Sequence, residues 1–119
     1  MIMLTLLLGI VASVVAHEAA HAIVARHLGW DVVGLKVQSW KVVAVSVKTT
    51  EKHIASSAWI VALAGPTTNI ALGDLCMSAH TPILTALGYF NFLVAIINLL
   101  PIPGSDGRVI LQGLREELE

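Results

Sequence analysis

Three long apolar segments dominate the chain and are separated by polar connections. No residue from Met1 to Ala16 is charged, and the apolar pattern continues to about residue 28. The second segment begins near Ile54 and contains no Asp, Glu, Lys or Arg before Asp74, and the third is uncharged up to Leu100. Because about 20 apolar residues in a helix cross a bilayer, the pattern predicts three transmembrane helices, at about 2–28, 54–78 and 82–100.

Two further patterns complete the predicted fold. In residues 31–49, β-branched residues alternate with other residues around a short polar connection, which is typical of a β-hairpin. Two prolines and two glycines within 101–107 cannot continue a regular helix. The sequence therefore predicts a membrane α-helical protein with three transmembrane helices, a small β-hairpin between the first two, and a loop and short C-terminal helix in 101–119.

Composition and charge support this fold class and exclude others. A chain of 119 residues allows a single domain, and 56% hydrophobic residues, 13% charged residues and a mean hydropathy of +0.83 are too apolar for an ordinary soluble domain. A net charge of −1 without a basic cluster argues against nucleic acid as a partner. The single Cys76 excludes an internal disulfide framework and a cysteine-based zinc site.

The distribution of basic residues predicts how the chain crosses the membrane. Five Lys or Arg residues lie between Arg26 and Lys52, and the connection between the second and third helices has none. By the positive-inside rule, the hairpin and the C-terminus face the cytoplasm. We expect a multi-pass integral membrane protein embedded in the lipid bilayer.

The candidate chemistry begins with His17-Glu18-x-x-His21, which lies inside the first apolar helix. Residues four positions apart in a helix share a face, so two such imidazoles can bind one Zn²⁺ while the glutamate reaches a water on the metal. Alternatively, the two histidines form hydrogen bonds within a helix bundle and Glu18 is protonated. Burying three ionisable groups on an apolar helix without a metal or another partner would be costly.

A catalytic zinc usually takes a third protein ligand, and Asp106 is the strongest candidate. It follows a spanning helix within a proline-glycine break, whereas most other acidic residues and histidines lie in polar flanks. A carboxylate near the hydrocarbon is costly unless it is paired or bound to metal. The alternative is an aspartate that forms a turn before Gly107 at the membrane surface. A second alternative concerns Gly65-Pro66-x-x-Asn69, which either kinks the second helix for packing or acts directly in the site.

Together these motifs resemble the site-2 protease family of intramembrane zinc metalloproteases. The match covers nearly the whole chain, as that family's minimal catalytic core, and departs from it at Ser105, where the family commonly has a bulky apolar residue. Three motifs carry the resemblance in the expected order: His17-Glu18-x-x-His21, Gly65-Pro66-x-x-Asn69, and Asn98-Leu99-Leu100-Pro101-Ile102-Pro103 leading into Asp106-Gly107.

The resemblance implies roles for individual residues. His17, His21 and Asp106 would bind one Zn²⁺ per chain, Glu18 would act as general base and acid, and Asn98 would help to hold the water or the oxyanion. The hairpin would lie beside the cleft and pair with an unwound substrate segment. The substrate-binding residues expected on this basis are Val43, Val45, Val47 and Asn69.

The function expected is an intramembrane zinc endopeptidase that hydrolyses peptide bonds in or near transmembrane segments, as in regulated intramembrane proteolysis. Its partners would be a transmembrane protein substrate and either further copies of itself or a regulatory membrane protein, in a bacterial or archaeal cell membrane. One alternative is a non-catalytic membrane binding or chaperone-like protein that retains the protease fold. The presence of Glu18 argues against it. A metal-handling membrane protein is a third possibility, but its ligands would follow a path instead of converging on one site.

Overall fold

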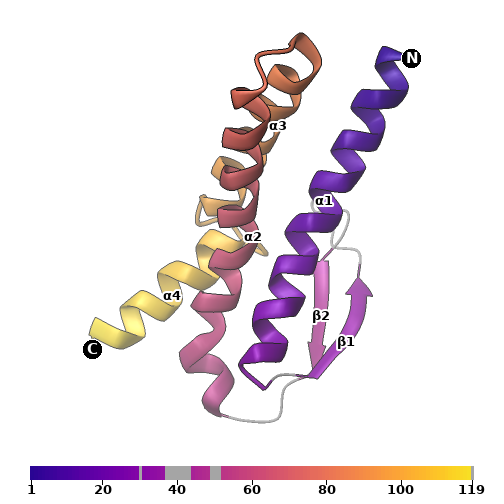
Figure 1. Ribbon diagram of the computed structural model, residues 1–119. Helices are drawn as coiled ribbons and strands as arrows, with labels where there is room; N and C mark the ends of the chain where they lie inside the picture. Colours follow the sequence, from indigo (N-terminus) through magenta and orange to yellow (C-terminus); the bar gives the residue numbers. More distant parts are fainter. Residues whose placement is uncertain (30, 37–43, 49–51, 119) are drawn as a thin grey trace.

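Four helices and two short strands make up the part of the chain that the computed structural model describes, residues 1–29, 31–36, 44–48 and 52–118 (Figure 1). The elements follow one another in this order: α1 (Ile2–His27), β1 (Asp31–Lys36), β2 (Ala44–Lys48), α2 (Lys52–Ser78), α3 (Pro82–Leu99) and α4 (Asp106–Leu118). The three long helices begin and end within two residues of the predicted bounds, and the predicted C-terminal helix is present.

The prediction of three membrane-spanning helices is confirmed by length and composition. Helix α1, residues Ala58–Ser78 of α2, and α3 are each long and apolar enough to cross a bilayer. Their ends follow local rules. Thr81 caps α3 by accepting a hydrogen bond from the backbone of Leu84 at 3.3 Å, with proline at the first helical position. Gly29 has φ +85° immediately beyond α1, where glycine is favoured.

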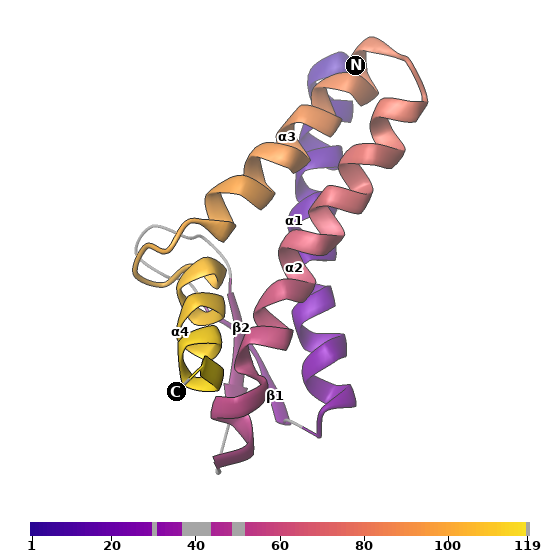
Figure 2. The same cartoon turned by 90° about the vertical axis from the view of Figure 1, so that its left-hand side faces the viewer.

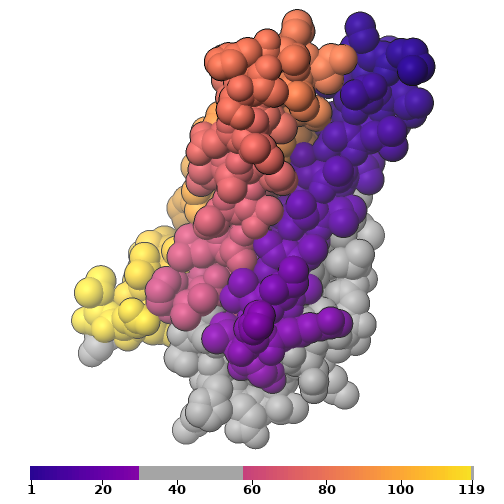
Figure 3. All heavy atoms as spheres, in the orientation of Figure 1, coloured from indigo at the N-terminus to yellow at the C-terminus, as the bar shows by residue number. Residues whose placement is uncertain are grey.

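Helix α2 lies at the centre of the fold and packs against α1, α3 and α4 (Figure 2). Figure 3 shows α1 and α2 side by side on one face, with α4 projecting away at the lower left. The outer surfaces of the helices are apolar, as bilayer contact requires. Exposed large apolar residues of α1 and α3 include Leu4, Leu7, Leu8, Val11, Val15, Leu93 and Ile96.

The interior of the bundle is more polar than its surface. Among the residues whose burial is described, nine polar or charged side chains are buried, against six apolar ones when Pro66 is included. In a membrane, polar groups inside a helix bundle must find partners within the protein or a ligand, because the surrounding hydrocarbon offers none. The buried polar residues are Ser13, His17, Glu18, His21, Asn69, Asn91, Asn98, Ser105 and Asp106.

The strands β1 and β2 pair antiparallel, with Val32 opposite Val47, Leu35 opposite Val45, and an irregularity between Val32 and Gly34. Both strands contact α1. The predicted hairpin connection, including Val43, lies outside the described residues. Val45 and Val47 fall within β2, and their contact with substrate stays a prediction.

The irregular segment after α3 turns the chain back so that α4 packs on α2. Gly104 has φ +81°, and Ser105 donates its backbone N–H to Ile102 O at 3.0 Å. Helix α4 then begins against the end of α3. A Cβ placed on Gly107 would overlap the carbonyl oxygen of Leu99 and lie 2.7 Å from that of Leu100. Only glycine permits this approach, and it fixes the position of the neighbouring Asp106.

We expect Gly107→Ala to lower the free energy of unfolding by about 1–3 kcal/mol, the usual cost of overpacking, because the clash is with backbone atoms that cannot move aside. Denaturant unfolding in detergent micelles, followed by circular dichroism, measures this change. Gln112→Ala, an exposed position on the same helix, is the matched control and should change stability by no more than about 0.5 kcal/mol. Equal stability of the two variants would contradict the close approach.

Candidate metal centre

The two histidines of the first motif lie on one face of α1 and meet Asp106 at the start of α4. The Nε2 atoms of His17 and His21 are 3.1 Å apart. Oδ2 of Asp106 lies 3.2 Å from the first and 3.3 Å from the second. All three residues are buried, and together they form a group that could hold a metal ion. Two ligands at zinc–nitrogen distances and a tetrahedral angle lie about 3.3 Å apart, so this triangle fits zinc.

Each imidazole also forms a hydrogen bond through its Nδ1 atom. These bonds determine whether Nε2 carries a proton or a free lone pair. Nδ1–H of His21 donates to the backbone oxygen of Val61 at 2.7 Å. Nδ1–H of His17 donates to Oδ1 of Asn69. With both protons on Nδ1, both Nε2 lone pairs face each other and the Asp106 carboxylate. A metal-free arrangement would need an additional proton on one imidazole, whereas a divalent cation satisfies all three atoms at once.

Glu18 is buried beside this group without belonging to it. Its Oε1 lies 4.0 Å from Nε2 of His17, and the residue is 4% exposed. This distance is longer than the roughly 3.3 Å expected between two ligand atoms of a tetrahedral zinc, and Glu18 is not part of the group that could hold the ion. It is short enough for the carboxylate to reach a water molecule in the site. The geometry is therefore compatible with the general base and acid role predicted for Glu18.

The Gly65-Pro66-x-x-Asn69 segment brings α2 against the two imidazoles. A Cβ placed on Gly65 would overlap Nε2 of His21 and lie 2.5 Å from Nε2 of His17. The segment therefore allows close packing and also contacts the metal group directly, so the two alternatives for this motif are not exclusive. Asn69 has no exposed surface, and both ends of its amide bind protein groups, His17 and Asn91. This arrangement favours a role in holding His17 over the predicted contact with substrate.

Asn98 is buried near the C-terminal end of α3. Its Nδ2 donates to the backbone oxygen of Val94 at 2.9 Å, and its Oδ1 has no hydrogen-bond partner within the described part of the chain. A buried oxygen without a partner costs about 1–3 kcal/mol and suggests a ligand or water. That oxygen can accept from a water molecule, and the second hydrogen of Nδ2 is the remaining donor for an oxyanion. The role predicted for Asn98 stays a prediction.

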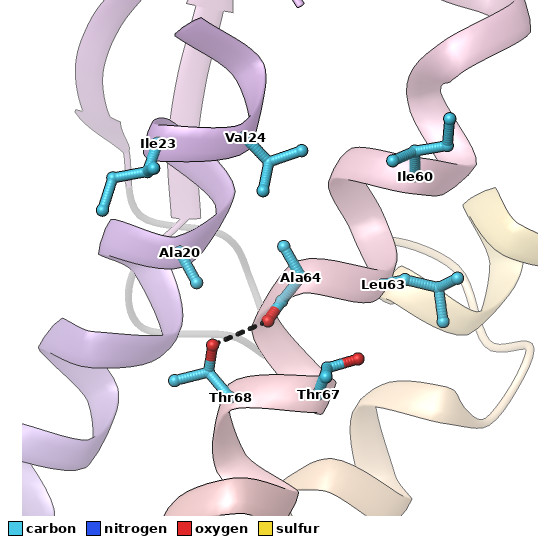
Figure 4. Close-up of a pocket in the computed structure, with 8 residues that line it drawn as sticks. All are labelled: Ala20, Ile23, Val24, Ile60, Leu63, Ala64, Thr67 and Thr68. Carbon is cyan, nitrogen blue, oxygen red and sulfur yellow. Dashed lines mark hydrogen bonds between the residues drawn. The ribbon is translucent and has the colours of Figure 1, made fainter. Parts of the chain in front are cut away.

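A shallow apolar groove lies between α1 and α2 on the outer face of the bundle (Figure 4). The hydroxyl of Thr68 donates to Ala64 O at 2.9 Å within its own helix, so it adds no free polar group. The lining contains none of the metal-group residues, although Ala20 adjoins His21 in sequence. The full lining is Ala20, Ile23, Val24, Ile60, Leu63, Ala64, Thr67 and Thr68.

Ser105, the position at which the sequence departs from the family pattern, caps α4. Its Oγ accepts from the backbone N–H of Arg108 at 3.1 Å and from that of Ile102 at 3.2 Å. The same hydroxyl lies 2.6 Å from Leu100 O, to which it can donate. Ser105 thus joins the loop to the first turn of the helix that begins with Asp106. The signal available in the sequence was a serine three residues before Arg108, the usual spacing of an N-cap.

Two more polar residues of the site region, Ser13 and Asn91, were not singled out from the sequence. Asn91 is 1% exposed and binds both Asn69 and Ser13. The available signal was the presence of polar side chains within spanning helices, which are rare there and often functional.

We expect Ser105→Ala to lower the free energy of unfolding by about 1 kcal/mol, as loss of an N-cap does, and to weaken zinc binding, because Asp106 is the first residue of the capped helix. Chelator competition measures zinc affinity. The matched control is Thr81→Ala, which removes the N-terminal cap of α3. This end of α3 is the one farther from Asp106 along the chain. The Thr81→Ala change should cost similar stability and leave zinc affinity unchanged. Identical zinc affinities for the two variants would refute the role of Ser105.

Comparison with known proteins identifies the family that the chain resembles. Residues 32–119 match the model of peptidase family M50. Two similar proteins of Mycobacterium tuberculosis carry the names "Putative zinc metalloprotease Rip3" and "Putative zinc metalloprotease Rip2". The first is 33% identical over 114 residues, covering 85% of this chain and 28% of the relative, and the second is 38% identical over 64 residues, covering 44% and 25%.

The chain thus spans less than a third of the length of these relatives. No solved structure matches it. The family match together with three helices that are able to span a membrane indicates a multi-pass membrane protein. The resemblance inferred from the motifs is confirmed: the chain belongs to peptidase family M50, the site-2 protease family of membrane zinc metalloproteases.

Proposed function

We propose that this chain is the catalytic part of an intramembrane zinc endopeptidase, which hydrolyses peptide bonds in or near transmembrane segments of other proteins. One observation carries the proposal. The Nε2 atoms of His17 and His21 and a carboxylate oxygen of Asp106 converge within 3.1–3.3 Å of one another between apolar helices. These three residues would hold one zinc ion per chain.

The remaining residues of the site supply proton transfer. A zinc ion held by the three ligands supplies Lewis acidity toward the scissile carbonyl and makes water a stronger acid. Glu18 would take a proton from the attacking water as the water oxygen bonds to the carbonyl carbon. It would return that proton to the leaving amine as the C–N bond breaks. Asn98 would orient the water or donate to the developing oxyanion.

Access to the peptide bond sets further requirements. A hydrogen-bonded transmembrane helix shields its carbonyl groups, so a substrate must unwind locally, and helix-breaking residues should favour cleavage. The paired strands β1 and β2 contact α1, the helix that carries both histidines. An unwound substrate segment would add to the edge of this pair by strand pairing. Water would enter from the cytoplasmic side, where the positive-inside rule puts the strands and the C-terminus.

The biological setting is part of the same proposal. The site would act in regulated intramembrane proteolysis in a bacterial or archaeal cell membrane. The curated relatives are more than three times as long as the aligned region, so regions outside it are one source of regulation. A regulatory membrane protein or a second copy of the chain is another.

The alternative, a binding or chaperone-like protein that retains the fold, is less well supported. A carboxylate 4.0 Å from the metal-facing nitrogen of His17 and 4% exposed is costly to bury. A site that only binds metal has no need of it, whereas hydrolysis does.

We expect Glu18→Gln to bind zinc as the wild type does and to cleave a model transmembrane substrate about 10²–10⁴-fold more slowly, the range for loss of a general base. The assay uses the purified chain in detergent micelles or liposomes with a substrate helix that contains a helix-breaking residue. Zinc content is measured on the same samples.

Two variants control this experiment. Glu116→Gln removes an exposed carboxylate on α4 and should cleave at the wild-type rate. His21→Ala should lose both zinc and cleavage. Equal cleavage by Glu18→Gln and the wild type would refute the proposed mechanism.

A further inference from the structure

A buried chain of side-chain hydrogen bonds crosses the three long helices and ends at His17. It begins at Ser13 of α1, passes through Asn91 of α3 and Asn69 of α2, and returns to α1 at His17. Asn69 and Asn91 are 0% and 1% exposed, Ser13 is 7% exposed and His17 is 2% exposed. No water from the bilayer core can replace a missing partner here, so each bond depends on its protein partner.

The partners of Asn91 fix the orientation of its amide. Its Nδ2 donates to the backbone oxygen of Leu87 at 2.9 Å, and a carbonyl oxygen can only accept. The other hydrogen of Nδ2 goes to Oγ of Ser13 at 3.0 Å, and that hydroxyl donates its own hydrogen to Gly9 O at 2.8 Å. The oxygen of the Asn91 amide is therefore turned toward Asn69.

The orientation of the Asn91 amide determines the orientation of Asn69, and through it the tautomer of His17. Nδ2 of Asn69 donates to Oδ1 of Asn91 at 2.8 Å, so the oxygen of Asn69 must face His17. An amide oxygen cannot donate, and Nδ1 of His17 must therefore carry the proton of this bond. The lone pair of the imidazole is then on Nε2, which faces His21 and Asp106.

We propose that Asn91 is a positioning residue of the metal site, which acts through Asn69 to hold His17 in its metal-binding tautomer. The proposal rests on the zinc site of the proposed function. Without the oxygen of Asn91, the Asn69 amide is free to turn over and present its NH₂ group to His17. The imidazole would then carry its proton on Nε2, where a proton excludes the metal.

The experiment measures zinc affinity by chelator competition on the full chain in detergent micelles, without substrate. Asn91→Leu replaces the amide with an apolar side chain of similar volume. It should weaken zinc binding by about 10–100-fold, the usual effect of losing an outer partner of a metal ligand. Asn91→Asp should retain most of the affinity, because a carboxyl kept neutral by the apolar interior still offers an oxygen to Asn69.

A control variant separates this effect from lost packing. Leu87→Ala removes a buried side chain of α3 that lies against Gly9 of α1 and leaves the hydrogen-bond chain in place. It should bind zinc nearly as tightly as the wild type, although it is expected to be the less stable protein.

A double-mutant cycle tests whether the two asparagines act in series. Because Asn91 acts through Asn69, Asn69→Leu and the double variant should lose zinc affinity equally, and additive losses would overturn the proposal. It would also be overturned if Asn91→Leu bound zinc as tightly as Leu87→Ala. If Asn91→Leu does not fold, ¹⁵N NMR of histidine-labelled protein compares the wild type with Asn91→Asp. Both proteins must carry the His17 proton on Nδ1, and a proton on Nε2 in either one would overturn the proposal. A wild-type protein that binds no zinc would overturn the proposed function itself, and this role with it.

Discussion

Two imidazole lone pairs and a carboxylate lie within 3.1–3.3 Å of one another between apolar helices, and the packing around them holds them there. The arrangement is electrostatically unfavourable without a cation, and the hydrocarbon of a bilayer offers no water to solvate these groups. The surrounding protein must therefore hold the three groups in place before any metal binds. His17 and His21 are held by hydrogen bonds to α2, and Asp106 by the turn that begins α4.

Two glycines allow the close approaches that bring the metal group together. Gly65 lets α2 lie directly against the imidazoles, and Gly107 lets α4 start against the carbonyl groups that end α3. Ser105 joins that turn to the preceding loop. The outer surface is apolar because it faces the hydrocarbon of the bilayer. The polar groups lie in the interior because only other parts of the protein can offer them partners.

The spans, the C-terminal helix and the metal group could be predicted because each has a local signal. Apolar length gives the spans, the four-residue spacing of His17 and His21 gives a shared helix face, and a carboxylate in a proline-glycine break marks Asp106. The partners of these groups could not be predicted. Asn69 and Asn91 are 22 residues apart and meet only through the packing of α2 on α3. For the same reason, the sequence alone does not show that Asn69 is buried between His17 and Asn91.

X-ray absorption at the zinc edge, on the purified chain with its metal content measured, shows whether His17, His21 and Asp106 hold one zinc ion. We expect one zinc per chain, bound by two imidazole nitrogens and by oxygen at about 2.0–2.2 Å, without sulfur. Zinc–sulfur scattering at about 2.3 Å, which would implicate Cys76, or the absence of stoichiometric zinc, would contradict it.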